Sequence, residues 1–167
     1  MKIHNQLLLS EEPISRSATD IISGFPVCPG FFDLNGATPL SGGVNFTLHT
    51  QYGTSCELLL FHSEEEEPYA VLPFPKAYRI GDVYSMIVLD LEIEDLEYAY
   101  RIDGPYKPEE GLIFDRNAVL LDPYAKAVAG QRHWGQEKIG SYHARVVRDT
   151  FDWENTPQSS RKMSDLI

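Results

Sequence analysis

Tyrosine and tryptophan side chains are the residues of this chain best suited to hold a ligand, because their rings stack on the apolar faces of other rings. Each such contact is worth about 1 kcal/mol, and the chain carries nine tyrosines and two tryptophans. No two of its five histidines have the i, i+4 spacing of a helical metal site, so we expect no metal and no cofactor. These histidines are His4, His49, His62, His133 and His143.

The glutamate run at 64–67 and the two cysteines are the other groups that could bind a cation. A Ca²⁺ site needs oxygen ligands at loop spacings with turns between them, which a bare run lacks. A solvated hairpin loop is therefore the favoured interpretation of the run. Cys28 and Cys56 lack a metal-ligand spacing, and a domain of this size folds without a disulfide. We interpret both as free thiols, with Cys56 buried at the start of a strand.

The composition predicts one folded domain and excludes several classes of partner. Of the 167 residues, 43% are hydrophobic and 11% aromatic, which is ample for a packed core. A net charge of -11 without a cluster of Lys and Arg disfavours nucleic acids and anionic membranes, and leaves a neutral glucan or another protein. Residues 1–16 contain neither a signal peptide nor a membrane span, so we expect a cytoplasmic protein.

Short strands separated by turns are expected to position these side chains. Val44, Phe46 and Leu48 alternate with polar neighbours, which predicts a strand with one apolar face. The apolar run at 56–62 predicts a strand buried on both sides, and Pro73 confines the next strand to a sheet edge. Further strands are expected at 82–91, 97–103 and 141–147. Short strands at this spacing, without amphipathic helices between them, predict an all-β fold, an antiparallel β-sandwich.

One short helix is predicted near the C-terminal end. Asp122 and Pro123 suit the N-cap and first position of a helix, and Gly130 suits its C-terminal stop. Asp103 and Gly104 predict a tight turn, in which the glycine permits a positive φ. The expected division is an N-terminal extension at 1–29, the β-sandwich at 30–148 and a linker at 149–167.

Three stretches of the chain resemble a known family in order and spacing. They read "GGVNFTLHTQYGTSCELLLF", then "YAYRIDGPYKPEEGLIFDRNAVLLDPYAKAVAG", then "FDWENTP" before "SDLI". This pattern is similar to the N-terminal domain of isoamylase- and glycogen-debranching-type enzymes of glycoside hydrolase family 13. That domain belongs to carbohydrate-binding module family 48 and is an immunoglobulin-like β-sandwich. The resemblance runs from about Gly30 to Ile167 and is most specific at residues 98–128.

The resemblance implies a non-catalytic accessory domain of a glycogen or starch debranching enzyme. The full-length protein would hydrolyse α-1,6-glucan linkages in a catalytic (β/α) barrel, whose first strand would begin near the "SDLI" of residues 164–167. The family's catalytic carboxylates lie on that barrel, so we expect no catalytic residue in this chain and no hydrolysis by it alone. The alternative is a free-standing module that binds glycogen or another α-glucan. An immunoglobulin-like adhesion domain is disfavoured because the chain lacks a signal sequence.

The resemblance also implies roles for individual aromatic residues. Tyr106 corresponds to an aromatic position after the Asp-Gly turn of glycogen-binding members, and is expected either to hold a sugar ring or to pack against its own turn. Those members also use a tryptophan in the loop after the second strand and a lysine beside the tyrosine strand. Here the corresponding loop, 62–68, has no aromatic residue, and Ala99 follows Tyr98. The candidate sugar-binding residues are Tyr106, Tyr84, Tyr69, Tyr52 and Trp134, of which Tyr106, Tyr84 and Trp134 are favoured.

A second set of aromatic residues is expected to dock against the catalytic barrel. In the family the Phe-Asp-Trp segment lies in the link between the two domains. Trp153, with Phe151 beside it, is therefore interpreted as an interdomain anchor. Tyr124, in the "DPYA" stretch, is the third candidate for this surface.

Overall fold

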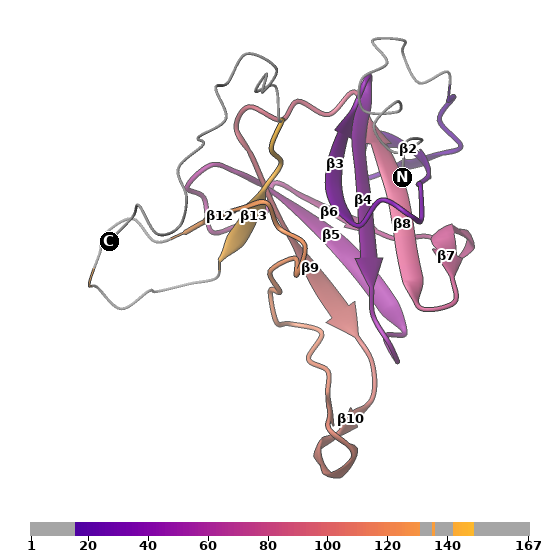
Figure 1. Ribbon diagram of the computed structural model, residues 1–167, viewed down its shortest axis with the longest axis vertical. Helices are drawn as coiled ribbons and strands as arrows, with labels where there is room; N and C mark the ends of the chain where they lie inside the picture. The colour runs from indigo at the N-terminus through magenta and orange to yellow at the C-terminus, as the bar shows by residue number, and fades with distance from the viewer. Residues whose placement is uncertain (1–15, 131–134, 136–141, 149–167) are drawn as a thin grey trace, which may run out of the picture.

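Two antiparallel β-sheets pack face to face in the computed structural model, which describes residues 16–130, 135 and 142–148 (Figure 1). The first sheet has the order β1-β2-β8-β4-β3, and β7 also pairs with β8. It consists of β1 (Asp20–Ile22), β2 (Phe25–Pro29), β3 (Gly36–Leu40), β4 (Gly43–His49), β7 (Arg79–Ile80) and β8 (Val83–Leu89). The predicted antiparallel β-sandwich is therefore confirmed.

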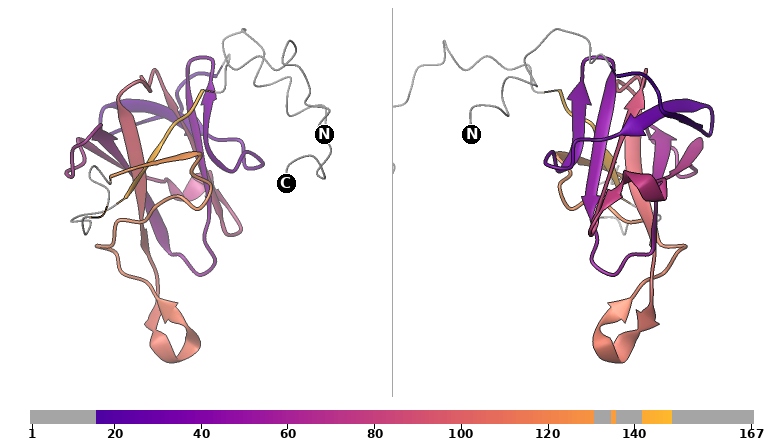
Figure 2. Two further views of the ribbon diagram at one scale, coloured as in Figure 1. Left: turned by 60° about the vertical axis from the view of Figure 1, so that its left-hand side comes forward. Right: turned by 90° about the vertical axis from the view of Figure 1, so that its right-hand side faces the viewer.

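The second sheet has the order β12-β13-β9-β5-β6. It consists of β5 (Ser55–His62), β6 (Ala70–Pro73), β9 (Leu96–Asp103), β12 (Ala127–Ala129) and β13 (His143–Arg145). A small hairpin of β10 (Tyr106–Lys107) and β11 (Leu112–Ile113) projects from one end of the sandwich (Figures 1 and 2). Two single-turn 3₁₀ helices, η1 (Lys76–Tyr78) and η2 (Pro108–Glu110), complete the described elements.

The core lies between the two sheets and follows the period-two pattern of the strands. Phe46 of β4 contacts Tyr98 of β9 edge to face, with the ring centroids 5.2 Å apart. Leu58 and Leu60 of β5 lie in the same buried cluster, as expected for alternate residues of one strand. Leu59 of β5 faces the opposite way and is equally buried. The prediction that this strand is buried on both sides is therefore confirmed.

The predicted helix at 122–130 is wrong. Asp122 does behave like an N-cap, because its Oδ1 accepts a hydrogen bond of 2.8 Å from the backbone N of Tyr124. The chain continues for only one turn, and Ala127–Ala129 then pair with β13. A two-turn helix is marginal without tertiary support, so pairing with a strand distant in the sequence takes its place.

The predicted N-terminal extension at 1–29 is wrong for residues 20–29. β2 pairs with β8, opposing Val27 to Val88, and the Val27 side chain lies in the main core. Pro26 and Pro29 interrupt this segment and obscured its strand pattern in the sequence. The predicted linker at 149–167 lies outside the described residues. In the part of the chain that the structure describes, no helix is long and apolar enough to cross a membrane.

Pro73 and the two cysteines behave as the sequence predicts. Pro73 ends β6, which is the outermost strand of its sheet. Cys28 and Cys56 are free thiols, and both are buried. Burial raises the pKa of the Cys56 thiol, so it stays protonated and acts as a small core residue.

Candidate functional site

The β10–β11 hairpin presents Tyr106 to solvent. The Tyr106 side chain is 72% exposed, and it pairs across the hairpin with Ile113. An ion pair of 3.0 Å between Lys107 Nζ and Glu110 Oε1 spans the hairpin tip. Gly111 ends η2 in the left-handed conformation, with φ of 76°, and its backbone N donates to the carbonyl of Pro108. An exposed ring on a short, internally bonded hairpin can stack on a ligand without rearranging the core.

The base of this hairpin is positioned by the close approach of Gly104 and Phe114. A Cβ atom at Gly104 would lie 2.6 Å from Cγ of the Phe114 ring, so only glycine leaves room for that ring. The φ of Gly104 lies outside the left-handed region, so the close approach of Phe114, and not a positive φ, requires glycine here. Phe114 in turn packs against the main core. This contact fixes the position of the hairpin, and with it Tyr106, relative to the sandwich.

Tyr84 is buried, so the prediction that it stacks on a sugar is wrong. Its side chain is only 2% exposed, and its ring packs edge to face with Phe74 at a centroid distance of 5.9 Å. The guanidinium of Arg79 lies over the Tyr84 ring, 4.9 Å from the ring centroid. Burial raises the pKa of the Tyr84 hydroxyl. No face of this ring is open to a ligand.

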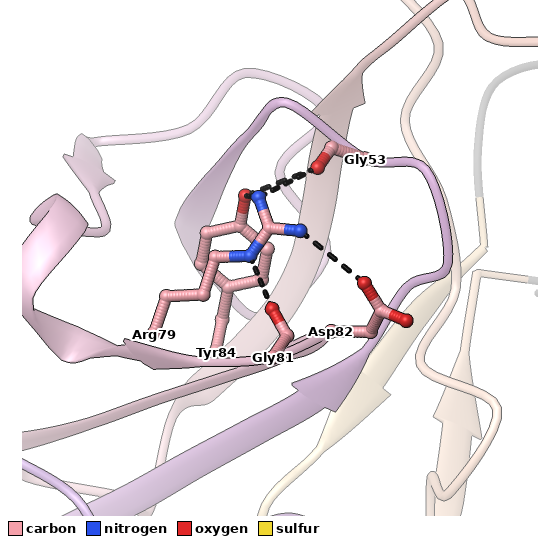
Figure 3. Close-up of polar contacts among 5 residues, drawn as sticks. All are labelled: Gly53, Arg79, Gly81, Asp82 and Tyr84. Carbon is pink, nitrogen blue, oxygen red and sulfur yellow. Dashed lines mark hydrogen bonds and ion pairs between the residues drawn. The ribbon is translucent and has the colours of Figure 1, made fainter.

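Arg79 explains why Tyr84 is covered (Figure 3). Its Nη1 donates to the carbonyl of Gly53 and to the Tyr84 hydroxyl, both at 2.9 Å. Its Nε donates to the carbonyl of Gly81 at 2.6 Å, and Nη2 contacts Asp82 Oδ1 at 3.3 Å. One side chain thereby joins the β7–β8 turn to the turn after β4. The sequence offers no local sign of this arrangement, because Gly53 is 26 residues from Arg79.

The remaining predicted site residues are only partly within the described chain. Trp134, Phe151 and Trp153 lie outside the described residues. Tyr124 is described and is exposed at its position beside β3, where a Cβ atom at Gly36 would lie 2.9 Å from Tyr124 Cβ. The exposed ring of Tyr124 remains a candidate for a docking surface.

The position of the missing lysine is also informative. Ala99 is fully buried and packs with Leu59 and Phe61 on the outer face of the second sheet. Val119, from the segment after the hairpin, packs against this group. An apolar, covered surface therefore occupies the place where a lysine would project. Recognition of a ligand through this position is not available in this chain.

Asp122 and Tyr98 form a buried polar contact that the sequence did not predict. The Tyr98 hydroxyl donates to Asp122 Oδ2 at 2.7 Å, and both side chains are buried. Burial raises the pKa of Asp122, although the hydrogen bonds from Tyr124 N and Tyr98 oppose the shift. The contact ties the "DPYA" stretch to the centre of β9. In the sequence, Asp122 indicated only a helix N-cap. No sequence pattern indicated its contact with Tyr98.

His143 and Glu97 form a second buried polar pair. His143 Nδ1 lies 3.1 Å from Glu97 Oε2, and the His143 ring stacks on Phe61 at a centroid distance of 3.8 Å. Glu97 Oε1 also accepts a hydrogen bond of 3.1 Å from the Ser63 hydroxyl. These contacts hold β13 against β9 and give His143 a structural role. Among the described residues, no group of three or more His, Cys, Asp or Glu side chains could hold a metal ion.

The comparison with protein families identifies this arrangement. The family model of carbohydrate-binding module 48, the isoamylase N-terminal domain, matches residues 35–125. The chain belongs to this family. The match includes the hairpin with Tyr106 and the buried Asp122, and the β-sandwich is the immunoglobulin-like fold that the resemblance implies.

Curated relatives are carbohydrate-active enzymes much longer than this chain. Isoamylase SU1 of Zea mays is 35% identical over 143 residues, which is 79% of this chain and 18% of the relative. Isoamylase 3 of Oryza sativa subsp. japonica is 34% identical over 130 residues, covering 73% of this chain and 16% of the relative. The glycogen debranching enzyme of Serratia proteamaculans is 30% identical over 140 residues, covering 76% of this chain and 20% of the relative. The chain thus spans a fifth or less of these three relatives.

Solved structures of pullulanases share the fold. The Group B Streptococcus pullulanase SAP superposes with a TM-score of 0.52 at 19% identity, over 71% of this chain and 15% of that protein. The apo pullulanase of Paenibacillus barengoltzii superposes with a TM-score of 0.50 at 20% identity, over 69% of this chain and 14% of that protein. These likenesses support the same β-sandwich architecture.

Proposed function

We propose that this chain is the non-catalytic N-terminal accessory domain of an enzyme that hydrolyses α-1,6 linkages of glycogen or starch. The observation that carries the proposal is the family match at 35–125, together with relatives named isoamylase and glycogen debranching enzyme. A cytoplasmic location, which the sequence predicts, is part of the proposal. The hydrolytic step is assigned to a catalytic barrel, because it requires two carboxyl groups facing each other across one cleft.

Two exposed aromatic positions would carry the accessory role. Tyr106 is proposed to contact the glucan, because its ring is exposed on a hairpin held by Gly104 and Phe114. Tyr124, together with Phe151 and Trp153, is proposed to dock against the barrel. The accessory domain would thus hold part of a branched glucan close to the catalytic cleft and stabilise the barrel by packing.

The test of the enzymatic part is hydrolysis by the full-length protein. We expect it to release reducing ends from glycogen and from branched limit dextrin. Tyr106→Ala should raise the KM for glycogen and leave kcat unchanged, because the ring would contribute binding far from the reacting bond. Ile80→Ala is the matched control, because Ile80 is a similarly exposed large apolar residue outside the hairpin. Inactivity of the full-length protein on every branched α-glucan would disprove the proposal.

The docking part has a separate test. Tyr124→Ala in the full-length protein should lower the midpoint of thermal inactivation, because the barrel loses a packed ring. The same substitution in the 167-residue chain should change its unfolding midpoint little. Equal effects in both proteins would contradict an interdomain role for Tyr124.

A further inference from the structure

A polar pocket lies on the outer face of the second sheet, at the end of β9 that leads into the β10–β11 hairpin. Its volume is about 260 Å³, and it is bounded by β5, β6, β9 and the loop after β11. Glu57 pairs with Arg101 and Ser55 with Asp103 across β5 and β9, so these four side chains project from the same face. Arg116 and Asn117 of the loop close one side of the pocket.

The charged groups of this pocket converge without pairing with one another. In the described part of the chain, the side chains of Arg101 and Arg116 make no hydrogen bond or ion pair. The Nε atom of Arg101 is buried and has no hydrogen-bond partner. Because this atom is closed to solvent, a ligand in the pocket would reach Arg101 through the other nitrogens of its guanidinium. These nitrogens are free to donate to a ligand acceptor.

The composition of the lining indicates the chemistry of that ligand. Two guanidinium groups and the Asn117 amide supply donors, while Glu57, Asp103 and the amide oxygen supply acceptors. The two positive and two negative charges cancel, so an anion attracted by the arginines would also face two carboxylates. A hydroxyl group both donates and accepts, and a molecule with several neighbouring hydroxyls can use both kinds of partner. The lining thus fits a neutral polyhydroxylated ligand better than an ion.

We propose that this pocket binds the hydroxyl groups of one glucose residue of an α-glucan chain. The inference rests on the proposed function for the identity of the polyol. Asp103 lines the pocket at the end of β9, and the chain runs directly from there into the hairpin that carries Tyr106 (Figure 1). Three residues span at most about 10 Å. One glucan chain can therefore contact the Tyr106 ring with one sugar and the pocket with another.

The test is a titration of the 167-residue chain with maltoheptaose, followed by the Nε–Hε NMR signals of its arginines. We expect the signals of Arg101 and Arg116 to shift with saturation. Arg116→Ala and Asn117→Ala lie at exposed loop positions, so they should preserve the fold. Arg116→Ala should weaken Kd about tenfold, as expected for loss of one hydrogen bond to a charged group. Arg148→Ala, at an exposed arginine outside the pocket, is the matched control and should leave Kd unchanged.

Three results would overturn the proposal. An unchanged Kd in both loop variants, with Tyr106→Ala alone weakening it, would place the sugar on the hairpin only. Absence of any maltoheptaose binding would remove the pocket as a sugar site. Inorganic phosphate that shifts both arginine signals at lower concentration than maltoheptaose would assign the pocket to an anion. None of these results bears on hydrolysis by the full-length protein, so the proposed function is tested independently.

Discussion

The most family-specific stretch of the chain, residues 98–128, contains two regions that differ completely in burial. Its ends are anchored in the sandwich, where Tyr98 and Asp122 are each 1% exposed and bonded to each other. Its middle forms the hairpin, where Tyr106 is 72% exposed and Ile113 is 69% exposed. A match to the family motif does not distinguish buried positions from exposed ones. The structure separates them into a buried anchor and a free surface, and only the latter can meet a ligand directly.

The two regions also differ in what stabilises them. The anchor depends on buried hydrogen bonds, which are costly to leave unsatisfied. The hairpin depends on its own turn, on an exposed ion pair worth at most about 1 kcal/mol and on the contact of Gly104 with Phe114. Substitutions in the anchor should therefore change stability, and substitutions at the hairpin surface should change binding.

The largest effect is expected from Asp122→Ala. The buried Tyr98 hydroxyl and the backbone N of Tyr124 both lose their acceptor, so the free energy of unfolding should fall by about 3 kcal/mol. Urea unfolding measures this loss. Asp115→Ala is the matched control, because Asp115 Oδ1 also accepts a backbone hydrogen bond two residues ahead, 2.9 Å from Asn117 N, but at the exposed surface. A loss as large in the control would refute the special role of burial at Asp122.

Gly104→Ala should have the next largest effect. The new Cβ would overlap the Phe114 ring, so the ring or the hairpin base must move, at a cost of about 2 kcal/mol. Introducing the same change in a Phe114→Leu background tests the cause, because the smaller side chain relieves the overlap. The two substitutions should therefore be non-additive in the free energy of unfolding. Additive effects would show that another contact makes Gly104 necessary.

Asp122→Asn is expected to raise stability relative to wild type as pH increases, whereas Asp122→Ala lowers it. Burial raises the pKa of Asp122 above that of the unfolded chain, so the folded state binds this proton more tightly. The contribution of this proton to the free energy of unfolding is fully present below the ordinary aspartate pKa of about 4. It is lost as pH rises through the raised pKa of the folded state. Wild type should thus lose stability relative to Asp122→Asn between pH 4 and 7, in paired urea titrations. A constant difference over that range would contradict the assigned direction.

The smallest change in stability is expected from Tyr106→Ala. The exposed ring buries little surface, so the free energy of unfolding should stay within about 0.5 kcal/mol of wild type. Its affinity for maltoheptaose should fall about fivefold, which corresponds to one stacking contact of about 1 kcal/mol. Calorimetric titration measures the affinity, and urea unfolding of the same sample measures the stability. A large loss of stability with unchanged affinity would reassign Tyr106 to the anchored region.

Much of the fold could be predicted because its signals are local. Strand β4 follows from the alternation of Val44, Phe46 and Leu48, and the burial of β5 follows from its continuous apolar run. The helix predicted at 122–130 failed for the same reason. Its capping residues are genuine local signals, but Ala127–Ala129 pair with β13, a strand distant in the sequence. No local pattern predicts that pairing.

The sequence by itself determined the all-β class, the family and the position of Tyr106 just after the Asp103-Gly104 pair, because strand period, turn residues and motif order are properties of neighbouring residues. It did not distinguish Tyr84 from Tyr106, since both are tyrosines at strand positions. Only the tertiary structure decided which ring is free. Arg79 and the turn at Gly53 close over Tyr84, while nothing comparable covers Tyr106 among the described residues. The exposure of a side chain depends on which distant segments pack against it, and those contacts form only in the folded tertiary structure.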